Sequence, residues 1–258
     1  MIQTTFDVPG LLATEGAPNL VSGRYNHIST REMHDVLGAL GWDAHRGYTV
    51  KSKSIDPLYR KHMIRYRSEM FSATEFPEIV MINSHDGSSS FQLKSGIFRL
   101  VCSNGLIVQS KTYKSLSIRH NNKVAGELDE MLDIIADYAM HVQDIMRIPD
   151  TWKRIMVAYE DRLDYYRKAA QLRSKTMTEH EIWDFESARR TEDQSNDLWT
   201  MYNRTQEHLV NGGYLASSAN GRQSTARPIN SIDGLDRINT KLYQMAEDIA
   251  FTAIHGCK

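Results

Sequence analysis

The sequence predicts an α+β fold, with a small antiparallel β-sheet core at about residues 44–123 and a large helical part after it. Three observations support this class: a capped helical pattern at 29–40, short alternating runs between turn residues over 47–120, and helical spacing of apolar residues in the rest of the chain. We therefore expect an N-terminal arm, helix and β-rich region at 1–123 and a helical region at 124–258, packed as one domain.

Residues 30–40 are the first predicted helix. Ser29 and Glu32 have the spacing of a capping box, in which a hydroxyl and a carboxylate satisfy backbone N–H groups at the helix start. Apolar side chains then repeat at helical intervals until Gly41, which is suited to end the helix. Residues 1–22 lack such periodicity, and we expect them to form an extended arm.

Six short runs are strand candidates because they are rich in apolar residues and are bounded by turn residues. They are residues 61–67, 78–83, 90–93, 97–102, 106–110 and 115–120. Asn104-Gly105 between two of them predicts a two-residue hairpin turn. In a rival interpretation Ser95 caps a short helix over 96–103, but the β-like run through Ile107 and Val108 favours the hairpin.

Apolar stripes predict several helices after residue 123. They cover about 128–142, a stretch capped by Asp150, a stretch opening at Thr191, and about 233–254. Thr178 with Glu181, and Thr191 with Gln194, have capping-box spacing. The helix that opens at Thr191 is expected to stop at Gly212-Gly213, within a polar, glycine-rich loop at 211–227.

Composition is typical of a globular protein in a reducing cytoplasm. Cys102 and Cys257 form neither a disulfide framework nor a metal-ligand spacing, and no apolar run approaches the length of a membrane span. The N-terminus does not resemble a signal peptide. We expect a cytoplasmic location in a bacterial host cell, no membrane partner, no cofactor and no metal.

The basic charge is concentrated in one segment. The formal net charge is −1, but residues 44–123 carry 13 Lys and Arg against 5 Asp and Glu, a net charge of +8. Such a distribution favours a polyanionic partner. The alternative is that the acidic helices neutralise this segment within the folded protein.

Basic residues on the predicted strands indicate a nucleic-acid surface. Lys61, Arg65 and Arg67 share one strand face, with about 6.6 Å between successive same-face residues. The remaining candidate contacts are Lys94, Arg99 and Arg119 near later strands, and Arg222 and Arg227 in the 211–227 loop. Aromatic residues such as Tyr66 and Phe91 could stack on bases. The alternative is a solvated face for the charges and a core position for the aromatics.

The segment 83–90, NSHDGSSS, is a polar cluster between two predicted strands. His85 and Asp86 suggest acid–base or metal chemistry, but adjacent residues of a strand point to opposite faces, and no HxH, HExxH or CxxC lies nearby. Asp86-Gly87 is a common turn pair. We interpret the segment as a turn, and a binding loop is the alternative.

Several blocks of sequence carry a resemblance. They are VSGRYNHIST (21–30), NSHDGSSSFQL (83–93), GIFRLVCSNGLIV (96–108), SIRH (117–120), LWTMYNRTQEHLVNGG (198–213) and RPINSIDGLDRINTKLYQMAED (227–248). They resemble the phage/plasmid-like family of the domain of unknown function 932. By motif position the resemblance implies the signature residues Tyr25, Asn83, His85, Asp86, Gly87, Arg99, Cys102, Asn104, Gly105 and His120. It implies a mobile-element protein and no particular reaction.

Three functional hypotheses are consistent with these observations. The first is a non-catalytic protein that binds single-stranded DNA, including an annealing protein of the phage recombination kind. The second is an interaction protein that counters a host defence system by binding a host protein. The third is an enzyme that uses His85 and Asp86, which nothing else in the sequence supports. A preference between DNA and RNA, and a homo-oligomeric state, stay open.

Overall fold

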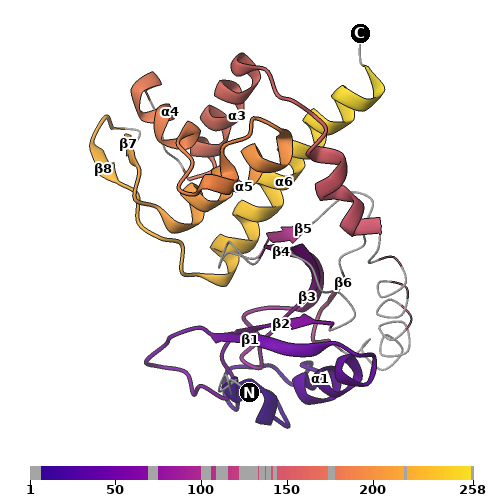
Figure 1. Cartoon of the computed structure of the whole chain (residues 1–258). Coiled ribbons are helices and arrows are strands. Elements are labelled where there is room, and N and C mark those ends of the chain that lie inside the picture. Colours follow the sequence, from indigo (N-terminus) through magenta and orange to yellow (C-terminus); the bar gives the residue numbers. More distant parts are fainter. Residues whose placement is uncertain are drawn as a thin grey trace. The chain divides into compact units, whose positions relative to one another are not determined.

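The computed structural model describes residues 7–68, 75–99, 106–108, 116–121, 133, 137, 141, 144–173, 178–217 and 220–256. The chain divides into two compact units, residues 1–145 and 146–258. The first unit contains an antiparallel sheet with a short N-terminal helix, and the second is mainly helical (Figure 1). The predicted α+β class is therefore confirmed.

The first unit is built on a six-stranded antiparallel sheet. Its strands are β1 (Asp43–Thr49), β2 (His62–Arg67), β3 (Glu75–Asn83), β4 (Phe91–Arg99), β5 (Leu106–Val108) and β6 (Leu116–Ile118). They follow the order β1-β2-β3-β4-β5, and β6 also pairs with β4. The predicted turn at 84–90 joins β3 and β4, which pair antiparallel over most of their lengths.

Helix α1 (Thr30–Ala39) contributes to the core on one face of this sheet. It begins at the predicted cap, where the Ser29 hydroxyl accepts a hydrogen bond from the Glu32 N–H at 3.2 Å. Its buried side chains pack with side chains from the strands and from the N-terminal arm, which holds the 3-10 turn η1 (Pro9–Leu12). Tyr66 and Phe91 belong to this core and are 0% exposed. The expectation that they stack on bases is therefore wrong, because the core holds both rings.

Strand β4 corrects the predicted strand boundaries in this part of the chain. Its range, Phe91–Arg99, joins the predicted run 90–93 to the start of the predicted run 97–102, which also excludes the rival helix for residues 96–99. In the hairpin with β5, Ile97 pairs with Leu106 and eight residues, 98–105, lie between them. This pairing alone does not test the predicted two-residue turn at Asn104-Gly105, which stays a prediction. Asn104 and Gly105 themselves lie outside the described residues.

The second unit packs its helices against a central one. Helix α5 (Leu198–Asn211) is buried from Leu198 to Val210, and α3 (Tyr159–Gln171), α4 (Glu179–Glu186) and α6 (Ile232–His255) contact it. A helix buried on all sides is typical of the middle of a helical unit. No helix in the described ranges is long and apolar enough to cross a bilayer.

Contacts within the second unit shift two predicted helix starts. Asp150 lies inside a helical stretch at 144–152, and α3 begins only at Tyr159. The chain between them is held extended, because the Val157 N–H donates to the Asn196 carbonyl at 3.1 Å and the Leu198 N–H donates to the Ile155 carbonyl at 2.8 Å.

The second shifted start is that of α5. Residues Thr191–Asp193 form the 3-10 turn η3, and the Asp197 carboxylate caps α5 by accepting from the Thr200 N–H at 2.8 Å. The capping box at Thr178 and Glu181 is confirmed. The predicted 211–227 loop contains a small hairpin, β7 (Leu215–Ser217) and β8 (Gln223–Thr225).

Candidate functional site

A buried polar network ties the N-terminal arm and α1 to the end of β3. Its centre is the Thr30 hydroxyl, which lies 3.0 Å from Nε2 of His62, Nε2 of His85 and Nδ2 of Asn83. All four of these residues are 0% exposed. Polar groups buried to this degree destabilise a fold unless they are hydrogen-bonded. The stability of this region therefore depends on the hydrogen bonds of the network.

The backbone contacts of the two histidines fix their tautomers. Nδ1 of His62 faces the Arg60 carbonyl at 2.9 Å, so Nδ1 carries the hydrogen and Nε2 accepts from the Thr30 hydroxyl. Nε2 of His85 faces the Gly10 carbonyl at 3.0 Å, so it carries the hydrogen and donates to Gly10 and to Thr30. Both rings are therefore neutral in a complete network.

Asn83 is the residue through which the largest number of these bonds pass. Its Nδ2 donates to the Ile28 carbonyl at 3.1 Å and to Thr30. Its Oδ1 accepts from the Ser84 N–H at 2.9 Å and lies 3.0 Å from Nε2 of His120. The network thus extends from the sheet to the segment after β6.

His120 lies between two hydrogen-bond acceptors. Nδ1 faces the Asn26 carbonyl at 3.0 Å while Nε2 faces Oδ1 of Asn83 at the same distance. A neutral imidazole has one N–H and can satisfy one of them, whereas the imidazolium satisfies both. Burial lowers the pKa of His120, although its bond with the Asn26 carbonyl opposes this. One face of the ring stacks on Tyr25, with 4.7 Å between the ring centroids.

The environment of His85 suits a structural role. Burial, with His62 and His27 nearby, lowers the pKa of His85 to about 3. Its Nδ1 is buried and has no hydrogen-bond partner among the described residues. A general base needs access to its substrate and a pKa near the working pH. His85 is 0% exposed, so its geometry does not favour the enzyme hypothesis.

The packing of the arm requires glycine at residue 10. A Cβ atom placed on Gly10 would lie 2.4 Å from Cε1 of His62. The backbone of the arm therefore approaches the ring as closely as only glycine allows, and this approach brings the Gly10 carbonyl to His85.

Next to the network lies an open polar pocket of about 590 Å³, which we call the serine-loop pocket. Its lining residues are Leu20, Val21, Ser22, Tyr25, Asp86, Gly87, Ser88, Ser89, Ser90, Arg119 and His120. The volume is within the range of small-molecule sites, roughly 300–1,000 Å³. The turn 83–90 thus has two sides, because His85 points into the network and Asp86 lines the pocket.

The two charged side chains of the pocket differ in their bonding. The Asp86 carboxylate accepts a hydrogen bond from the Ser88 N–H at 2.9 Å, which shapes the turn. Arg119 is exposed, and no carboxylate of the described residues forms an ion pair with its guanidinium. The pocket therefore offers a guanidinium, a carboxylate and serine hydroxyls to a polar ligand.

Arg65 and Arg67 alternate with the core residues Ile64 and Tyr66 and so lie on one face of β2, as the alternation predicts. Lys61 precedes the strand, and the face is not an open basic strip. Arg65 is 7% exposed, and it forms an ion pair with Glu78, which is fully buried. Arg67 pairs with the same carboxylate at 2.8 Å. The expected exposure of Arg65 is therefore wrong, because Glu78 on the neighbouring strand draws both guanidinium groups to itself.

The other predicted contacts are dispersed. Lys94 is 6% exposed on β4, and Arg99 ends that strand with its side chain outside the described set. Arg119 lines the serine-loop pocket. Arg222 and Arg227 belong to the second unit, where the Arg227 carbonyl accepts from Arg173 at 2.7 Å. Within the first unit, Arg119 alone of the predicted basic residues lines this pocket.

The signature residues are better grouped than the basic ones. Tyr25, Asn83, His85, Asp86, Gly87 and His120 all belong to the network or the pocket. Cys102 lies outside the described residues, as do Asn104 and Gly105. In the described ranges, no group of three His, Cys, Asp or Glu residues is arranged to hold a metal ion.

Sequence reasoning missed Thr30, His62 and Gly10. The sequence predicts a helix start at Thr30 and a strand at His62, and both predictions are correct locally. Thr30 lies within the block 21–30, which was the available signal. Their common site depends on contacts between residues 32 to 75 positions apart.

Comparison with known proteins finds a matching family model and similar proteins of Escherichia coli. The family model described as a domain of unknown function, DUF932, matches residues 18–240. UPF0380 protein YafZ of Escherichia coli K12 is 32% identical over 240 residues, covering 88% of this chain and 82% of the relative. UPF0380 protein YfjQ of the same organism is 31% identical over 242 residues, covering 88% and 83%. No solved structure gives a significant match.

Proposed function

We propose that this chain, which belongs to the DUF932 family, binds single-stranded nucleic acid without catalysing a reaction on it. The serine-loop pocket would hold one phosphate-bearing residue of the strand. A phage or plasmid origin, and a role in annealing or recombination, are parts of this proposal. The proposal gives the pocket, rather than the β2 face, the main contact with the strand.

The observation that carries the proposal is Arg119. It is exposed and lines a polar pocket that also contains four signature residues, in the segment of the chain with a net charge of +8. Arginine recognises phosphate through paired N–H donors, and a single such contact is sequence-independent. The Asp86 carboxylate and the serine hydroxyls supply acceptors and donors for the polar groups of the sugar or base.

The pocket walls limit how a base could bind. The ring of Tyr25 stacks on that of His120. Gly16 approaches the Tyr25 ring so closely that an added Cβ would lie 2.6 Å from its Cε1. The Tyr25 hydroxyl also donates to the Ser84 carbonyl at 3.2 Å. Tyr25 is therefore a fixed wall, and we expect the strand to be held by its phosphate and polar edges more than by stacking.

A salt series with the full chain tests this proposal. Fluorescence anisotropy of a labelled oligonucleotide should show binding that weakens with salt, and Arg119→Ala should reduce the slope of log K against log salt by about 0.7. Arg119→Lys should restore much of that slope. Arg31→Ala removes another exposed arginine of the same unit, outside the pocket, and should leave affinity nearly unchanged.

Two results would overturn the proposal. One is the absence of single-strand binding by the parent chain at low salt. The other is equal loss of affinity in Arg119→Ala and Arg31→Ala, which would indicate a diffuse electrostatic effect. Duplex DNA and RNA in the same series would establish the preference among nucleic acids.

A second candidate is an interaction protein that counters a host defence system. The observation that favours it lies in the second unit, where several large apolar side chains are exposed. They include Met156 at 69%, Trp183 at 58% and Phe251 at 56%. Exposed apolar groups of this size are common at protein interfaces when they gather in one patch.

A further inference from the structure

We propose that the serine-loop pocket takes up a proton at His120 when it binds a phosphate group, so that binding strengthens as the pH falls. The inference deepens the proposed nucleic-acid function and rests on it. It follows from the position of the His120 ring, which lines the pocket together with Arg119 and also belongs to the buried network. One imidazole thus connects the pocket with the network.

Both ring nitrogens of His120 face atoms that can only accept a hydrogen bond. Nδ1 lies 3.0 Å from the Asn26 carbonyl, which is a backbone oxygen with no hydrogen to donate. Nε2 lies 3.0 Å from Oδ1 of Asn83. In either neutral tautomer, one nitrogen lone pair therefore points at an oxygen lone pair. The imidazolium donates to both oxygens, so the hydrogen-bond geometry favours the charged ring.

A rotation of the Asn83 amide does not relieve this conflict. In the observed orientation Nδ2 donates to the Ile28 carbonyl at 3.1 Å, and Oδ1 accepts from the Ser84 N–H at 2.9 Å. The rotated amide would place its oxygen against the Ile28 carbonyl and its NH₂ group against the Ser84 N–H. The network therefore presents an oxygen to His120, and the ring itself must supply the donor.

Burial and charge oppose the proton in the unliganded pocket. Burial is the largest cause that lowers the pKa of His120, and the nearby His27 adds to it, although the bond with the Asn26 carbonyl opposes both. Arg119 lines the same pocket, and a second positive charge beside its guanidinium is unfavourable. The titratable and charged groups around the ring are Tyr25, His27, His85, Asp86 and Arg119, and Arg24 is next to Tyr25 in the arm.

A phosphate in the pocket reverses this balance, because its negative charge offsets that of Arg119 and attracts the proton. An anion about 6–8 Å from the ring, at an effective dielectric constant of about 20, favours the imidazolium by about tenfold to hundredfold. The linkage is reciprocal, so the proton favours the bound phosphate in turn.

The sign of the pH effect follows from this linkage. The pKa of His120 is higher with the phosphate than without it, so the gain in affinity is complete below the pKa of the free pocket and is lost above that of the bound pocket. Burial holds the free pKa below its ordinary value of 6.5. Affinity should therefore rise as the pH falls through this region.

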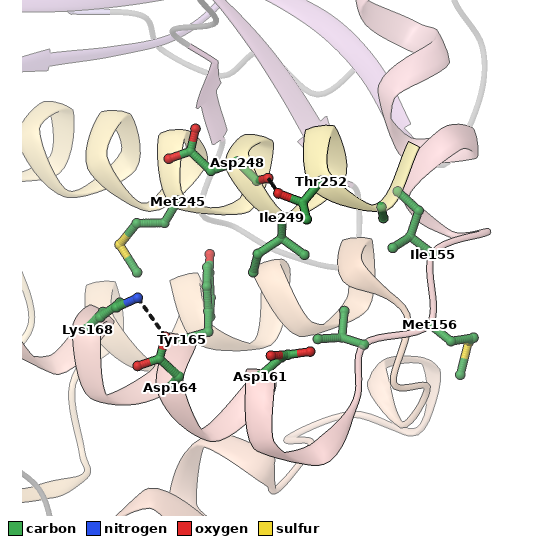
Figure 2. A pocket seen from close by; sticks show the side chains of 12 residues that line it. Ile155, Met156, Asp161, Asp164, Tyr165, Lys168, Met245, Asp248, Ile249 and Thr252 are labelled. Carbon is green, nitrogen blue, oxygen red and sulfur yellow. Dashed lines mark hydrogen bonds and ion pairs between the residues drawn. The ribbon is translucent and has the colours of Figure 1, made fainter. Parts of the chain in front are cut away.

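Another cavity of the chain serves as a comparison. It lies between α3 and α6 in the second unit and has a volume of about 460 Å³ (Figure 2). Lys168, its basic side chain, is paired with Asp164 at 2.6 Å. None of its described lining residues is a histidine. A phosphate in that cavity would find no imidazole to protonate, so proton uptake reports on the serine-loop pocket.

Calorimetric titration of the full chain with oligothymidylate tests the inference. Without a terminal phosphate, this strand keeps its charge over the range of the experiment, so a pH effect belongs to the protein. Binding should be about threefold to tenfold tighter at about pH 6 than at about pH 8. Buffers with different ionization enthalpies should give an uptake of about half a proton per site at about pH 6. Acid unfolding would weaken binding, so the sign separates the two effects.

Histidine variants assign the proton. His120→Gln keeps a donor toward Asn83 but does not titrate, so it should lose both the proton uptake and the rise of affinity in acid. His27→Gln is the matched control, because His27 lies beside the network without lining the pocket, and it should keep the uptake. An NMR titration of the parent needs no substitution. The His120 ring should titrate at a higher pH with the oligonucleotide than without it.

Three outcomes would overturn the inference. The first is binding by the parent with an affinity that does not rise in acid and with no proton uptake. The second is an uptake that His27→Gln abolishes and His120→Gln keeps. The third is a titration of the His120 ring that the oligonucleotide leaves unchanged. Each of these leaves the proposed nucleic-acid function standing, whereas the absence of binding at every pH and low salt would overturn both.

Discussion

Replacement of Asn83 by leucine should destabilise the first unit strongly, although the two side chains are similar in size. Asn83 is 0% exposed and makes four contacts, with the Ile28 carbonyl, the Thr30 hydroxyl, the Ser84 N–H and Nε2 of His120. Each lost hydrogen bond costs about 1 kcal/mol, and each partner stranded without water costs more. Some partners keep other bonds, so we expect a total of about 3–5 kcal/mol.

Hydrogen exchange followed by mass spectrometry is suited to this measurement, because it reports on the two units separately. A loss of 3–5 kcal/mol in opening free energy corresponds to exchange about 100- to 5,000-fold faster in the amides of β3 and β4, at roughly tenfold for each 1.4 kcal/mol. Amides of α5 in the second unit should exchange at the parent rate.

Asn26→Leu is the matched control. Asn26 belongs to the same region, but it takes part through its backbone, with its N–H donating to the His120 carbonyl and its own carbonyl facing Nδ1 of His120. The substitution keeps both contacts and should cost less than about 1 kcal/mol. If Asn83→Leu accelerates exchange no more than Asn26→Leu, the network contributes nothing beyond packing and our reasoning is refuted.

Three further perturbations test the first unit. Acid should destabilise it, because burial lowers the pKa of His85 to about 3 while an unfolded histidine titrates near 6.5. The contribution of neutral His85 to the free energy of unfolding is complete above about pH 6.5, and it declines toward pH 3 by up to about 1.4 kcal/mol per pH unit. The substitution His85→Gln should flatten this part of the profile of urea midpoint against pH. Gly10→Ala should cost about 1–3 kcal/mol in urea unfolding, whereas Gly38→Ala on α1, where nothing lies within 4 Å of the added Cβ, should be neutral or stabilising. Glu78→Gln should cost about 3–5 kcal/mol because Arg65 and Arg67 lose their shared carboxylate, and a thermal midpoint equal to that of the exposed-site variant Glu15→Gln would contradict this.

Periodicity and capping patterns predicted the elements whose causes are local. Ser29 caps α1 and Thr178 caps α4 because each motif lies within four residues of the chain. The alternation at 61–67 also predicted which residues of β2 share a face. What that face meets depends on strand register, and register places Glu78 of β3 beside Arg65 and Arg67. A count of basic residues along the sequence contains no such information.

The elements that sequence reasoning misplaced depend on contacts between distant residues. Residues 155–157 have a helical pattern, yet their backbone bonds go to 196–198, so α3 begins later than predicted. The sequence alone makes His85 a catalytic candidate. In the structure its ring is buried and bonds to the carbonyl of Gly10, which lies 75 residues earlier in the chain. Polar residues of this kind are ambiguous in a sequence, because burial decides whether they are structural or reactive.

The two sides of the turn 83–90 make the structural and binding roles separable. Asn83 and His85 face the network, which positions the arm carrying Leu20 to Tyr25, and those arm residues form one wall of the serine-loop pocket. Asp86 and Arg119 line the pocket. Neither residue takes part in the hydrogen bonds that join Thr30 to His62, His85 and Asn83. Loss of Asn83 should therefore reduce both stability and ligand binding, because the wall loosens with the network. Loss of Arg119 should reduce binding at unchanged stability. If Arg119→Ala unfolds as easily as Asn83→Leu, the pocket residues contribute to folding as the network does, and the polar side chains of the turn serve folding alone.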